Sequence, residues 1–533
     1  MTTHRAILLA ATISLIGCAT DTSNPVTRSA VSHSLHAARA KHISAEQRAA
    51  LYLQAIAEVM KQPGSLAARD TYNAATAELT MLLRSAEGGQ LWNRPLNVTL
   101  NGTIYQLSFA PASRQNSTWD PGYFDSIETP VQTDEKRLKL QDIDAGYGAP
   151  LVGIHKSADP KKDFFPTEGI AAPITAIVEF SAHSNVVHTR KASLSLHDPT
   201  RRETVMLAGK SRPLAADFTA PLAFYPNSRL LGFKEAMRVD RYFDTASLTM
   251  LQPYDPERIP VVFVHGLMSQ PGMWENTINA VESDPVLRGK FQFWTYGYPT
   301  GAPISISALQ LRESLAGVYQ RYPKTKDMVL VSHSLGGLLS KMQTTRSGRK
   351  AWDAAFGAES DEIYQKVSNE SIVKKALIFE PNPHIKRVVF VCVPHRGSPL
   401  ADNYIGAIGI SLIHMPMQIM DRIQAQIGES LVNVMNNKGE AFPPSVHGLS
   451  QKSPLLHALD TCPIEVPHHT IAGDRGKGNS PHSTDGVVPY HSSHLPSAQS
   501  EVMVPGPHSS CGLPQTTQEI SRILHLHLKT TGY

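Results

Sequence analysis

Charge is sparse in this sequence. Asp, Glu, Lys and Arg make up 18% of its 533 residues, the net charge is +4, and Lys and Arg form no long run. A protein that binds nucleic acid needs a concentrated positive surface for the phosphates. We therefore predict no nucleic-acid partner.

Long apolar runs are missing as well. No window holds the roughly eighteen consecutive apolar residues that a helix needs to cross a bilayer. We therefore expect no membrane-spanning helix. The hydrophobic content of 41% still allows a large core, and 533 residues exceed one ordinary domain. Two or more domains are expected.

The N-terminus carries the pattern of an export signal. A basic start precedes AILLAATISLIG and Cys18, which is typical of a signal peptide. Residues 15–18 (LIGC) resemble the lipobox of bacterial lipoproteins. The resemblance implies removal of residues 1–17 and a membrane anchor of acyl chains on Cys18, in the bacterial cell envelope. Ala19 after the cysteine implies the outer membrane, facing the periplasm. A secreted protein cleaved nearby is the alternative.

Cysteine is scarce, with four in the chain. Cys392 lies in the apolar run RVVFVCVP, which predicts a buried thiol, whereas Cys462 and Cys511 lie in polar, loop-like stretches. Two loop cysteines of an exported protein can pair in an oxidising compartment. We predict a disulfide between Cys462 and Cys511, and two free thiols are the open alternative.

Changes of pattern divide the chain up to residue 250. Residues 18–44 are rich in Ser, Thr, Ala and His without periodicity, which favours a flexible tether. Apolar residues at helical spacing between about 44 and 86 predict a helical pair. Short alternating runs between about 94 and 250 predict β-rich structure. We take 45–250 as a smaller N-terminal domain of unknown role, either structural or partner-facing.

The organisation changes again in residues 251–533. Near-continuous apolar runs alternate with helix-like segments, which predicts an α/β fold with a mostly parallel sheet covered on both faces. The runs are IPVVFV, FQFWTY, DMVLVS, RVVFVCV, HHTIAG and EVMV. In such sheets the loops at the carboxyl ends of strands hold the ligand. Residues that follow each run are therefore candidates for chemistry.

One of these loops is a sharp turn around a serine. The segment SHSLGG, with Ser334 at its centre, follows the run DMVLV and precedes the helical stretch LLSKMQ. A strand-to-helix turn of this kind raises its central side chain above the sheet and needs small neighbours. Ser332, Gly336 and Gly337 meet that need. Taken alone, the segment also fits an ordinary turn.

Four segments together resemble bacterial α/β-hydrolases of the esterase and lipase kind: VVFVHGL, SHSLGG, VPHRGSPLAD and DGVVP. Some similarity extends to the GPI inositol deacylase and triacylglycerol lipase groups. The resemblance covers about 250–530, and Ser332 departs from it because the family has glycine there. It implies an α/β-hydrolase fold and a serine nucleophile with no cofactor. No acidic cluster supports a structural calcium or another metal.

The resemblance also implies an order of catalytic side chains, namely serine, acid, histidine. A serine hydroxyl needs a base to accept its proton and a third group to orient that base. Ser334 is the expected nucleophile. Asp485, in the DGVVP segment after the run HHTIAG, is the expected acid. Asp474 is its rival, although its basic neighbours offer it a surface ion pair instead.

The expected base is His508, because it follows the last apolar run and precedes the final amphipathic helix. His491 and His494 compete from the acid loop. In this family, two backbone N–H groups stabilise the anionic oxygen of the reaction intermediate. The resemblance assigns them to Leu267, in the His-Gly loop, and Leu335.

The predicted reaction is hydrolysis of a carboxylic ester through an acyl-enzyme, on a hydrophobic or lipid-like substrate that the resemblance implies. An insertion at about 401–465 contains the apolar stretch IGAIGISLIHMPMQIMDRI, which favours a lid or cap over an acyl-binding cleft. Packing against the N-terminal domain is the alternative. Two other functions stay open: a catalytically silent envelope lipoprotein that acts as a binding module, and an amidase or peptidase. The oligomeric state is unknown.

Overall fold

The computed structural model describes residues 34–40, 42–85, 89–133, 135–181, 188–225, 246–401, 443, 445–476 and 483–532. These residues form two compact units. The first unit takes its residues from Met1–Phe109, Ile177–Leu194 and Met206–Lys210, and the second from Ala110–Ala176, Ser195–Val205 and Ser211–Tyr533. The predicted signal peptide, Cys18 and most of the predicted lid lie outside the described residues.

This division differs from the predicted domain boundary at residue 250. Most of the predicted β-rich domain belongs to the second unit, together with residues 251–533. The reason is a shared core, because Leu138 and Val152 belong to the same hydrophobic cluster as Val261 and Phe263. Periodicity in a sequence marks single elements but does not say which apolar faces meet.

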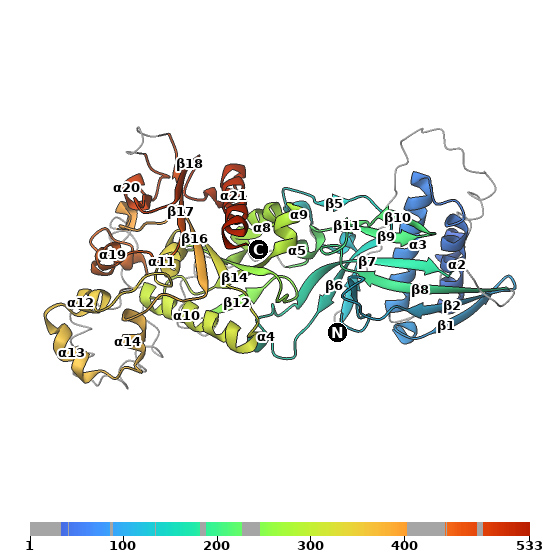
Figure 1. Cartoon of the computed structure of the whole chain (residues 1–533), viewed down its shortest axis with the longest axis horizontal. Coiled ribbons are helices and arrows are strands. Elements are labelled where there is room, and N and C mark those ends of the chain that lie inside the picture. Colours follow the sequence, from blue (N-terminus) through green and yellow to red (C-terminus); the bar gives the residue numbers. More distant parts are fainter. Residues whose placement is uncertain are drawn as a thin grey trace, which may run out of the picture. The chain divides into compact units, whose positions relative to one another are not determined.

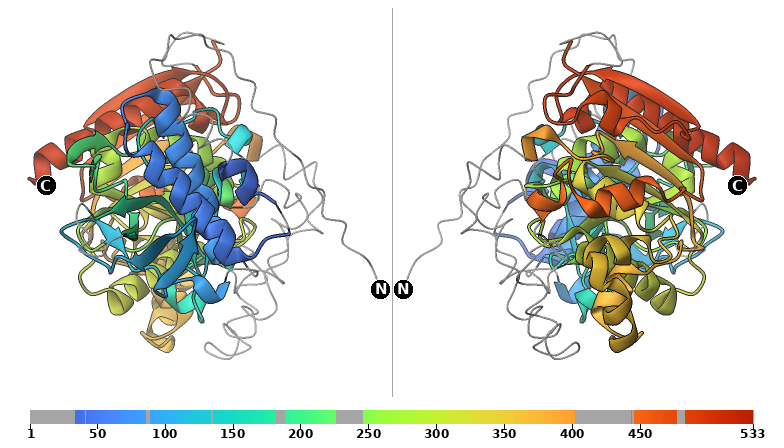
Figure 2. Two further views of the ribbon diagram at one scale, coloured as in Figure 1. Left: turned by 90° about the vertical axis from the view of Figure 1, so that its right-hand side faces the viewer. Right: turned by 90° about the vertical axis from the view of Figure 1, so that its left-hand side faces the viewer.

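Two helices, α2 (Ala45–Val59) and α3 (Leu66–Arg84), lie side by side in the first unit (Figure 2, left). Each begins after a serine, Ser44 or Ser65, whose hydroxyl accepts a hydrogen bond from a backbone N–H of the first turn. The predicted helical pair is therefore confirmed.

Residues 34–40 belong to the predicted tether but are folded. Residues 34–38 form a helical turn. Arg48, on α2, donates a hydrogen bond from Nε to the backbone oxygen of Ala38 at 3.0 Å, and the Ala38 side chain is fully buried. The prediction of a flexible tether is wrong for residues 34–40, because their alanine finds a packing partner that the local sequence does not reveal.

A mixed sheet has the strand order β1-β2-β8-β7-β6-β4. Strands β2 and β8 pair in parallel, whereas β1 with β2, β4 with β6, and β6 with β7 are antiparallel. The bounds are β1 (Leu96–Leu100), β2 (Thr103–Phe109), β4 (Ser126–Glu128), β6 (Ala149–His155), β7 (Ile170–Phe180) and β8 (Thr189–His197). Shorter elements of this region are β3 (Thr118–Trp119), β5 (Ile143–Asp144), α4 (Pro160–Asp163), β9 (Thr204–Leu207), β10 (Lys210–Pro213), β11 (Ala216–Asp217) and α5 (Ala220–Phe224).

A second sheet, of seven strands, has the order β12-β14-β13-β15-β16-β17-β18 and lies within the second unit (Figure 1). Strand β12 is antiparallel to β14, and every other neighbouring pair is parallel. Strands β13 to β18 coincide with the six apolar runs of the sequence. The bounds are β12 (Ser247–Met250), β13 (Ile259–Val264), β14 (Phe291–Gly297), β15 (Met328–His333), β16 (Ile385–Val391), β17 (His468–Asp474) and β18 (Ser500–Pro505).

Helices cover both faces of this second sheet, as the predicted α/β fold requires (Figure 1). Phe263 and Val331 pack with α8, α9 and α21 on one face, whereas Val264 and Leu330 pack with α10 and α11 on the other. Successive side chains of a strand point to opposite faces, so a strand covered on both sides is apolar throughout. The described α-helices that follow β12 along the chain are α8 (Glu275–Glu282), α9 (Pro285–Lys290), α10 (Ile304–Arg321), α11 (Leu335–Lys341), α12 (Lys350–Phe356), α13 (Ser360–Lys366), α14 (Ile372–Leu377), α18 (Ser445–Gly448), α19 (Pro454–Asp460), α20 (Tyr490–Ser493) and α21 (Pro514–Thr531).

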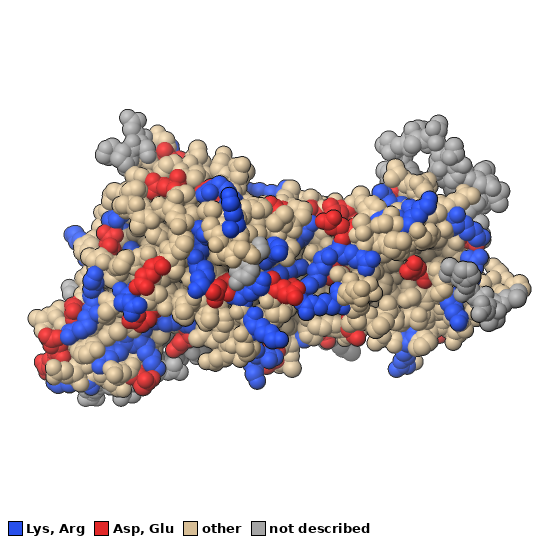
Figure 3. Space-filling model, in the orientation of Figure 1, with Lys and Arg blue, Asp and Glu red and all other residues tan. Residues whose placement is uncertain are grey.

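Two further properties of the fold concern membrane spanning and surface charge. Within the part of the chain that the structure describes, no helix combines the length and the apolar character that a bilayer span requires. Lys and Arg side chains are interspersed with Asp and Glu on the face shown in Figure 3, in keeping with the net charge of +4.

The predicted disulfide between Cys462 and Cys511 is absent, because both cysteines are free thiols, as is Cys392. Cys462 is buried at the end of α19, where its Sγ donates to the backbone oxygen of Ala458 at 3.4 Å. Cys511 is buried in the hydrophobic cluster beside α21. The prediction was wrong because polar neighbours in the sequence conceal that each thiol packs inside the fold at a separate place.

Candidate active site

Ser334 lies in the turn between β15 and α11. Its backbone has φ +52° and ψ −124°, a conformation that residues other than glycine rarely adopt. Two glycines make the turn possible. A Cβ at Gly336 would lie 2.4 Å from the backbone oxygen of His265, and one at Gly337 would lie 2.1 Å from Cγ2 of Val393. The strained serine and its close-packed glycines have the geometry of a nucleophile elbow.

Ser332 stands where the α/β-hydrolase pattern has glycine. Its side chain is fully buried, and its Oγ donates a hydrogen bond to the backbone oxygen of Val389 on β16 at 3.3 Å. The hydroxyl therefore has a partner, and the departure from glycine leaves no unsatisfied polar group at Ser332.

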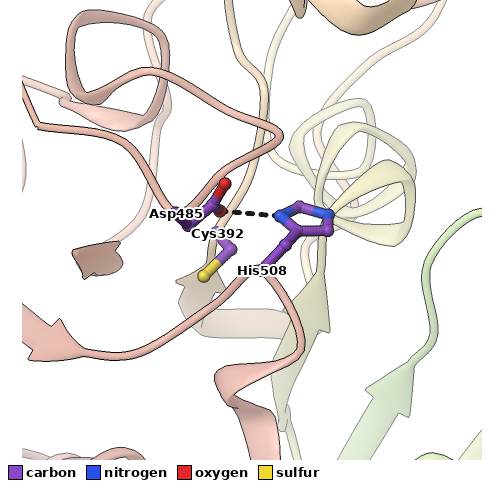
Figure 4. Close-up of side chains that lie close together, drawn as sticks. All are labelled: Cys392, Asp485 and His508. Carbon is purple, nitrogen blue, oxygen red and sulfur yellow. Dashed lines mark hydrogen bonds and ion pairs between the residues drawn. The ribbon is translucent and has the colours of Figure 1, made fainter. Parts of the chain in front are cut away.

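The structure brings the side chains of Ser334, Asp485 and His508 together. Ser334 Oγ donates a hydrogen bond to His508 Nε2 at 2.9 Å. His508 Nδ1 donates to Asp485 Oδ2 at 2.7 Å (Figure 4). The three residues follow β15, β17 and β18 along the chain, so they meet at the carboxyl edge of the parallel sheet.

Three features match the α/β-hydrolase pattern: the strand order, the elbow after β15, and the order of Ser334, Asp485 and His508 along the chain. The second unit has the α/β-hydrolase fold. In this unit Ser334, Asp485 and His508 come from three different loops. Each loop is anchored by a strand of one rigid sheet.

No family model matches the chain, and no curated protein matches it in sequence. Among solved structures, the chain is similar to a lipase from Bacillus licheniformis in its mature form, at 19% identity over 51% of this chain and 93% of that one, with a TM-score of 0.31. A thermophilic esterase from Thermogutta terrifontis is similar at 14% identity over 54% of this chain and 94% of that one, with a TM-score of 0.28. An enol-lactonase from Burkholderia xenovorans is similar at 13% identity over 54% and 98% of the two chains, with a TM-score of 0.26.

The Asp485 carboxylate has partners besides His508. Its Oδ1 accepts hydrogen bonds from the N–H groups of Val487 (2.8 Å) and Val488 (2.7 Å). Burial alone would raise the pKa of this carboxyl. The hydrogen bond and charge of His508, with the two N–H groups, outweigh burial and lower the pKa below its usual value. Asp485 is therefore ionised at neutral pH.

The rival side chains have other partners. Asp474, at the end of β17, accepts a hydrogen bond from the N–H of Gly476 at 2.7 Å. His494 pairs with Glu501 at 2.8 Å, and the ring of His491 lies 3.4 Å from a glutamine amide. The geometry therefore favours Asp485 and His508 over these alternatives.

The His-Gly loop lies against Ser334. A Cβ at Gly266 would lie 2.9 Å from Cβ of Ser334, so only glycine allows this approach. The Tyr298 hydroxyl donates to the backbone oxygen of His265 at 2.9 Å, and the two rings stack with their centres 4.5 Å apart. These contacts hold the loop in place.

The two predicted oxyanion donors, Leu267 and Leu335, directly follow the two residues of that contact, Gly266 and Ser334. Leu335 directly follows Ser334 and begins α11, so its N–H has no acceptor within its own helix. Leu267 directly follows Gly266. Both N–H groups thus belong to residues next to the close contact between Gly266 and Ser334. Their role as oxyanion donors stays a prediction.

His333 supports His508, although no sequence pattern singles it out beyond its place beside Ser334. His333 Nε2 donates to the backbone oxygen of His508 at 2.8 Å, and the two ring centres are 4.7 Å apart. Burial lowers the pKa of His333 to about 3. The ring is therefore neutral and acts as a fixed donor to the His508 loop.

A cavity of about 420 Å³ lies elsewhere in the second unit. Its lining includes Asp255 and Arg258, which precede β13, and Glu282 and Arg288, which precede β14. These residues mark the amino ends of the strands, whereas Ser334 follows a carboxyl end. The cavity is therefore not the place where Ser334 would meet a substrate.

Two side chains of this site, those of Asp485 and His508, lie close enough to Cys392 to form a possible set of metal ligands. Among the described residues, Cys392, Asp485 and His508 each offer a ligand atom within 4.8 Å of the others (Figure 4). Asp485 and His508 already share a hydrogen bond at 2.7 Å. The sequence identified Cys392 only as a buried thiol and gave no sign of this contact.

Proposed function

We propose that this chain is a serine hydrolase that cleaves carboxylic esters through an acyl-enzyme intermediate. The observation that supports the proposal most is the continuous hydrogen-bond chain from Ser334 Oγ through His508 to Asp485. A serine hydroxyl becomes an effective nucleophile when a base accepts its proton and a third group orients the base. Of these three groups, Ser334 and Asp485 each lie within hydrogen-bond reach of His508.

In the proposed reaction, Ser334 Oγ attacks the carbonyl carbon of the ester while its proton passes to His508 Nε2. Asp485 keeps the proton on His508 Nδ1 and stabilises the imidazolium. The N–H groups of Leu267 and Leu335 receive the negative oxygen. His508 gives its proton to the leaving alcohol, then deprotonates a water that attacks the acyl-enzyme, and finally returns the proton to Ser334.

A hydrophobic or lipid-like ester is the proposed substrate class. It is supported by the sequence resemblance to esterases and lipases and by the apolar stretch within 401–465, which we propose as a lid. Met268, in the His-Gly loop, has a side chain that is 49% exposed, which fits contact with an apolar group. Hydrolysis rates for p-nitrophenyl esters of increasing acyl length test this class, and a clear preference for acetate would count against it.

The lipid anchor on Cys18 and the outer membrane facing the periplasm stay part of the proposal. Their support is the LIGC segment with Ala19 after it. Metabolic labelling with palmitate, compared between wild type and Cys18→Ser, tests the anchor. Equal labelling of both proteins, or no labelling of either, would reject it.

Labelling with a fluorophosphonate probe tests the central proposal, because the probe bonds covalently to an activated serine. We expect the wild type to be labelled and Ser334→Ala to be unlabelled. Ser314→Ala is a matched control, since Ser314 lies on α10 and its hydroxyl donates to the backbone oxygen of Gln310 at 2.8 Å. This control should be labelled like the wild type.

Other outcomes separate the competing functions. Labelling that persists in Ser334→Ala rejects Ser334 as the nucleophile. A folded wild type that is never labelled favours the silent binding module. Peptide substrates, assayed beside p-nitrophenyl esters, distinguish an esterase from an amidase or peptidase with the same side chains.

A further inference from the structure

The motif VPHRGS (residues 393–398) supplies no group to the proposed reaction, but it lies against the loop that carries the proposed acid. We call residues 483–494, which include Asp485, the acid loop. Ser398 Oγ donates a hydrogen bond to the backbone oxygen of Val487 in this loop at 2.5 Å. Only 3% of Ser398 is exposed, and a hydrogen bond in buried surroundings is stronger than one in water. The motif thus binds the acid loop two residues after the acid.

One peptide group connects this serine to Asp485. The carbonyl of Val487, which accepts from Ser398, and the N–H of Val488 belong to the same peptide bond. That N–H donates to Asp485 Oδ1 at 2.7 Å. A peptide group is planar, so a donor on its oxygen fixes the direction of its N–H and strengthens the bond that the N–H donates. Hydrogen bonds therefore run without a break from Ser398 to the carboxylate, which in turn accepts from His508 (Figure 4).

The same motif binds the acid loop at a second place. Arg396 Nη1 donates to the backbone oxygens of His491 at 2.7 Å and His494 at 2.8 Å. Ser492 Oγ accepts from the N–H of Arg396 at 3.1 Å and donates to the backbone oxygen of Gly397 at 2.7 Å. A guanidinium is always charged, which strengthens the bonds that it donates. The motif therefore holds the acid loop at both the turn after the acid and the helical turn beyond it.

The motif is itself fixed in the fold. Gly397 has φ +80°, and a Cβ there would lie 2.7 Å from the backbone nitrogen of Gln451, so the position requires glycine. The N–H of Ser398 donates to the backbone oxygen of Leu449 at 2.9 Å. A donor that is held in this way can position the group that accepts from it.

We propose that Ser398 is a positioning residue for ester hydrolysis. Through the peptide between Val487 and Val488 it fixes the carboxylate of the proposed acid in the orientation that holds the His508 ring. This inference rests on the proposed function. A purely structural role is the competing explanation, because Ser398 Oγ also accepts from the N–H of Leu400 at 3.2 Å. The bond that the hydroxyl donates is the shorter one, 2.5 Å against 3.2 Å, which favours the positioning role.

Variants of Ser398 test the inference through the kinetics of p-nitrophenyl ester hydrolysis. Ser398→Ala removes the hydroxyl, whereas Ser398→Thr keeps a hydroxyl that can donate. We expect Ser398→Ala to lower kcat about threefold to tenfold with KM nearly unchanged, because one hydrogen bond is lost and no substrate contact is removed. Ser398→Thr should recover most of this loss. If its extra methyl group prevents folding, Ser398→Cys, a weaker donor without that methyl group, should have a kcat between those of the wild type and Ser398→Ala.

NMR of the free protein separates positioning from packing. In the full chain with ¹⁵N-labelled histidine, the proton that His508 Nδ1 donates to Asp485 should give a downfield resonance. We expect this resonance to move upfield in Ser398→Ala, because a carboxylate that can turn holds the proton less well, and to return in Ser398→Thr. A loss of packing alone would lower the free energy of unfolding without moving the resonance.

Ser371→Ala is the matched control. Only 2% of Ser371 is exposed, and its Oγ accepts from the N–H of Lys374 at 3.2 Å at the start of α14. The variant therefore repeats the loss of the accepted bond in Ser398→Ala at a place outside the acid loop. We expect it to keep the wild-type kcat and the wild-type resonance.

The results that overturn the inference differ from those that reject the proposed function. An unchanged kcat in Ser398→Ala overturns it, and so does a folded Ser398→Thr that is as defective as Ser398→Ala. A loss of kcat without any change of the resonance would establish the purely structural role instead. A folded wild type without probe labelling or ester turnover rejects the proposed function, while the resonance still reports whether Ser398 positions the carboxylate beside His508.

Discussion

At the scale of single residues, the site depends on the tautomer of His508. Asp485 Oδ2 accepts the Nδ1 proton, which leaves Nε2 free to accept from Ser334. In Asp485→Asn the amide can present an N–H to Nδ1, so the ring would carry its proton on Nε2 and could no longer accept one. We expect kcat to fall on the order of 10³–10⁴-fold with little change in KM.

Steady-state ester hydrolysis measures this effect. Asp474→Asn is the matched control, because Asp474 Oδ1 accepts the N–H of Gly476 in its own turn. This variant should keep near-wild-type kcat. The assignment of the acid is wrong if Asp474→Asn is the variant that loses activity.

At the scale of elements, close packing restricts which residues the turn around Ser334 can hold. A Cβ at Gly337 would lie 2.1 Å from Cγ2 of Val393, and both residues are buried. Gly337→Ala should therefore lower the free energy of unfolding by about 1–3 kcal/mol, as overpacked cores do. Val393→Ala in the same chain should recover part of that loss, since the clash is with the valine side chain.

Urea unfolding measures both effects. Gly289→Ala is a matched control, because Gly289 lies on α9 with no atom within 4 Å of an added Cβ. It should raise stability by about 0.5–1 kcal/mol, since alanine loses less backbone freedom than glycine on folding. Equal effects of the two glycine variants would show that close packing at the elbow is unimportant.

The elements differ in how far the sequence predicts them. Strand β13 coincides with IPVVFV, because a strand buried on both faces must be apolar at every position. Strand β12 escapes prediction, since it is a short edge strand whose burial alternates. Ser334, Asp485 and His508 could be proposed because each follows a predicted strand.

Other features depend on contacts that a local pattern does not contain. The bond from His333 to the backbone of His508 joins positions 175 residues apart. The place of Cys392 depends on the packing of β16 against β17. The boundary at residue 250 and the disulfide were predicted wrongly for the same reason, because both follow from which buried faces meet.

At the scale of the whole molecule, buried histidines make folding depend on pH. Burial lowers the pKa of His265 and His527 to about 4, and of His333 and His469 to about 3, from the usual 6.5. A base whose pKa is lower in the folded state contributes its full stability above pH 6.5 and loses it as the pH falls toward the folded value. We therefore expect the free energy of unfolding to drop between pH 6.5 and about 4.

Two of these histidines face a buried cation, which makes the prediction specific. Arg387 donates from a guanidinium N–H to His469 Nε2 at 2.6 Å, and from Nε to His527 Nδ1 at 3.3 Å. A proton on either ring would remove an acceptor and set two positive charges side by side. Each such ring can add up to about 1.4 kcal/mol per pH unit to the slope of stability against pH.

Urea unfolding from about pH 7.5 to 4.5, followed by fluorescence of the buried Trp274, Trp294 and Trp352, measures this slope. His527→Gln keeps an acceptor that does not titrate, so the slope should flatten relative to the wild type. His491→Gln, at an exposed position of the same unit, should keep the wild-type slope. A wild-type slope near zero would mean that the buried rings titrate as freely in the folded protein as in the unfolded chain.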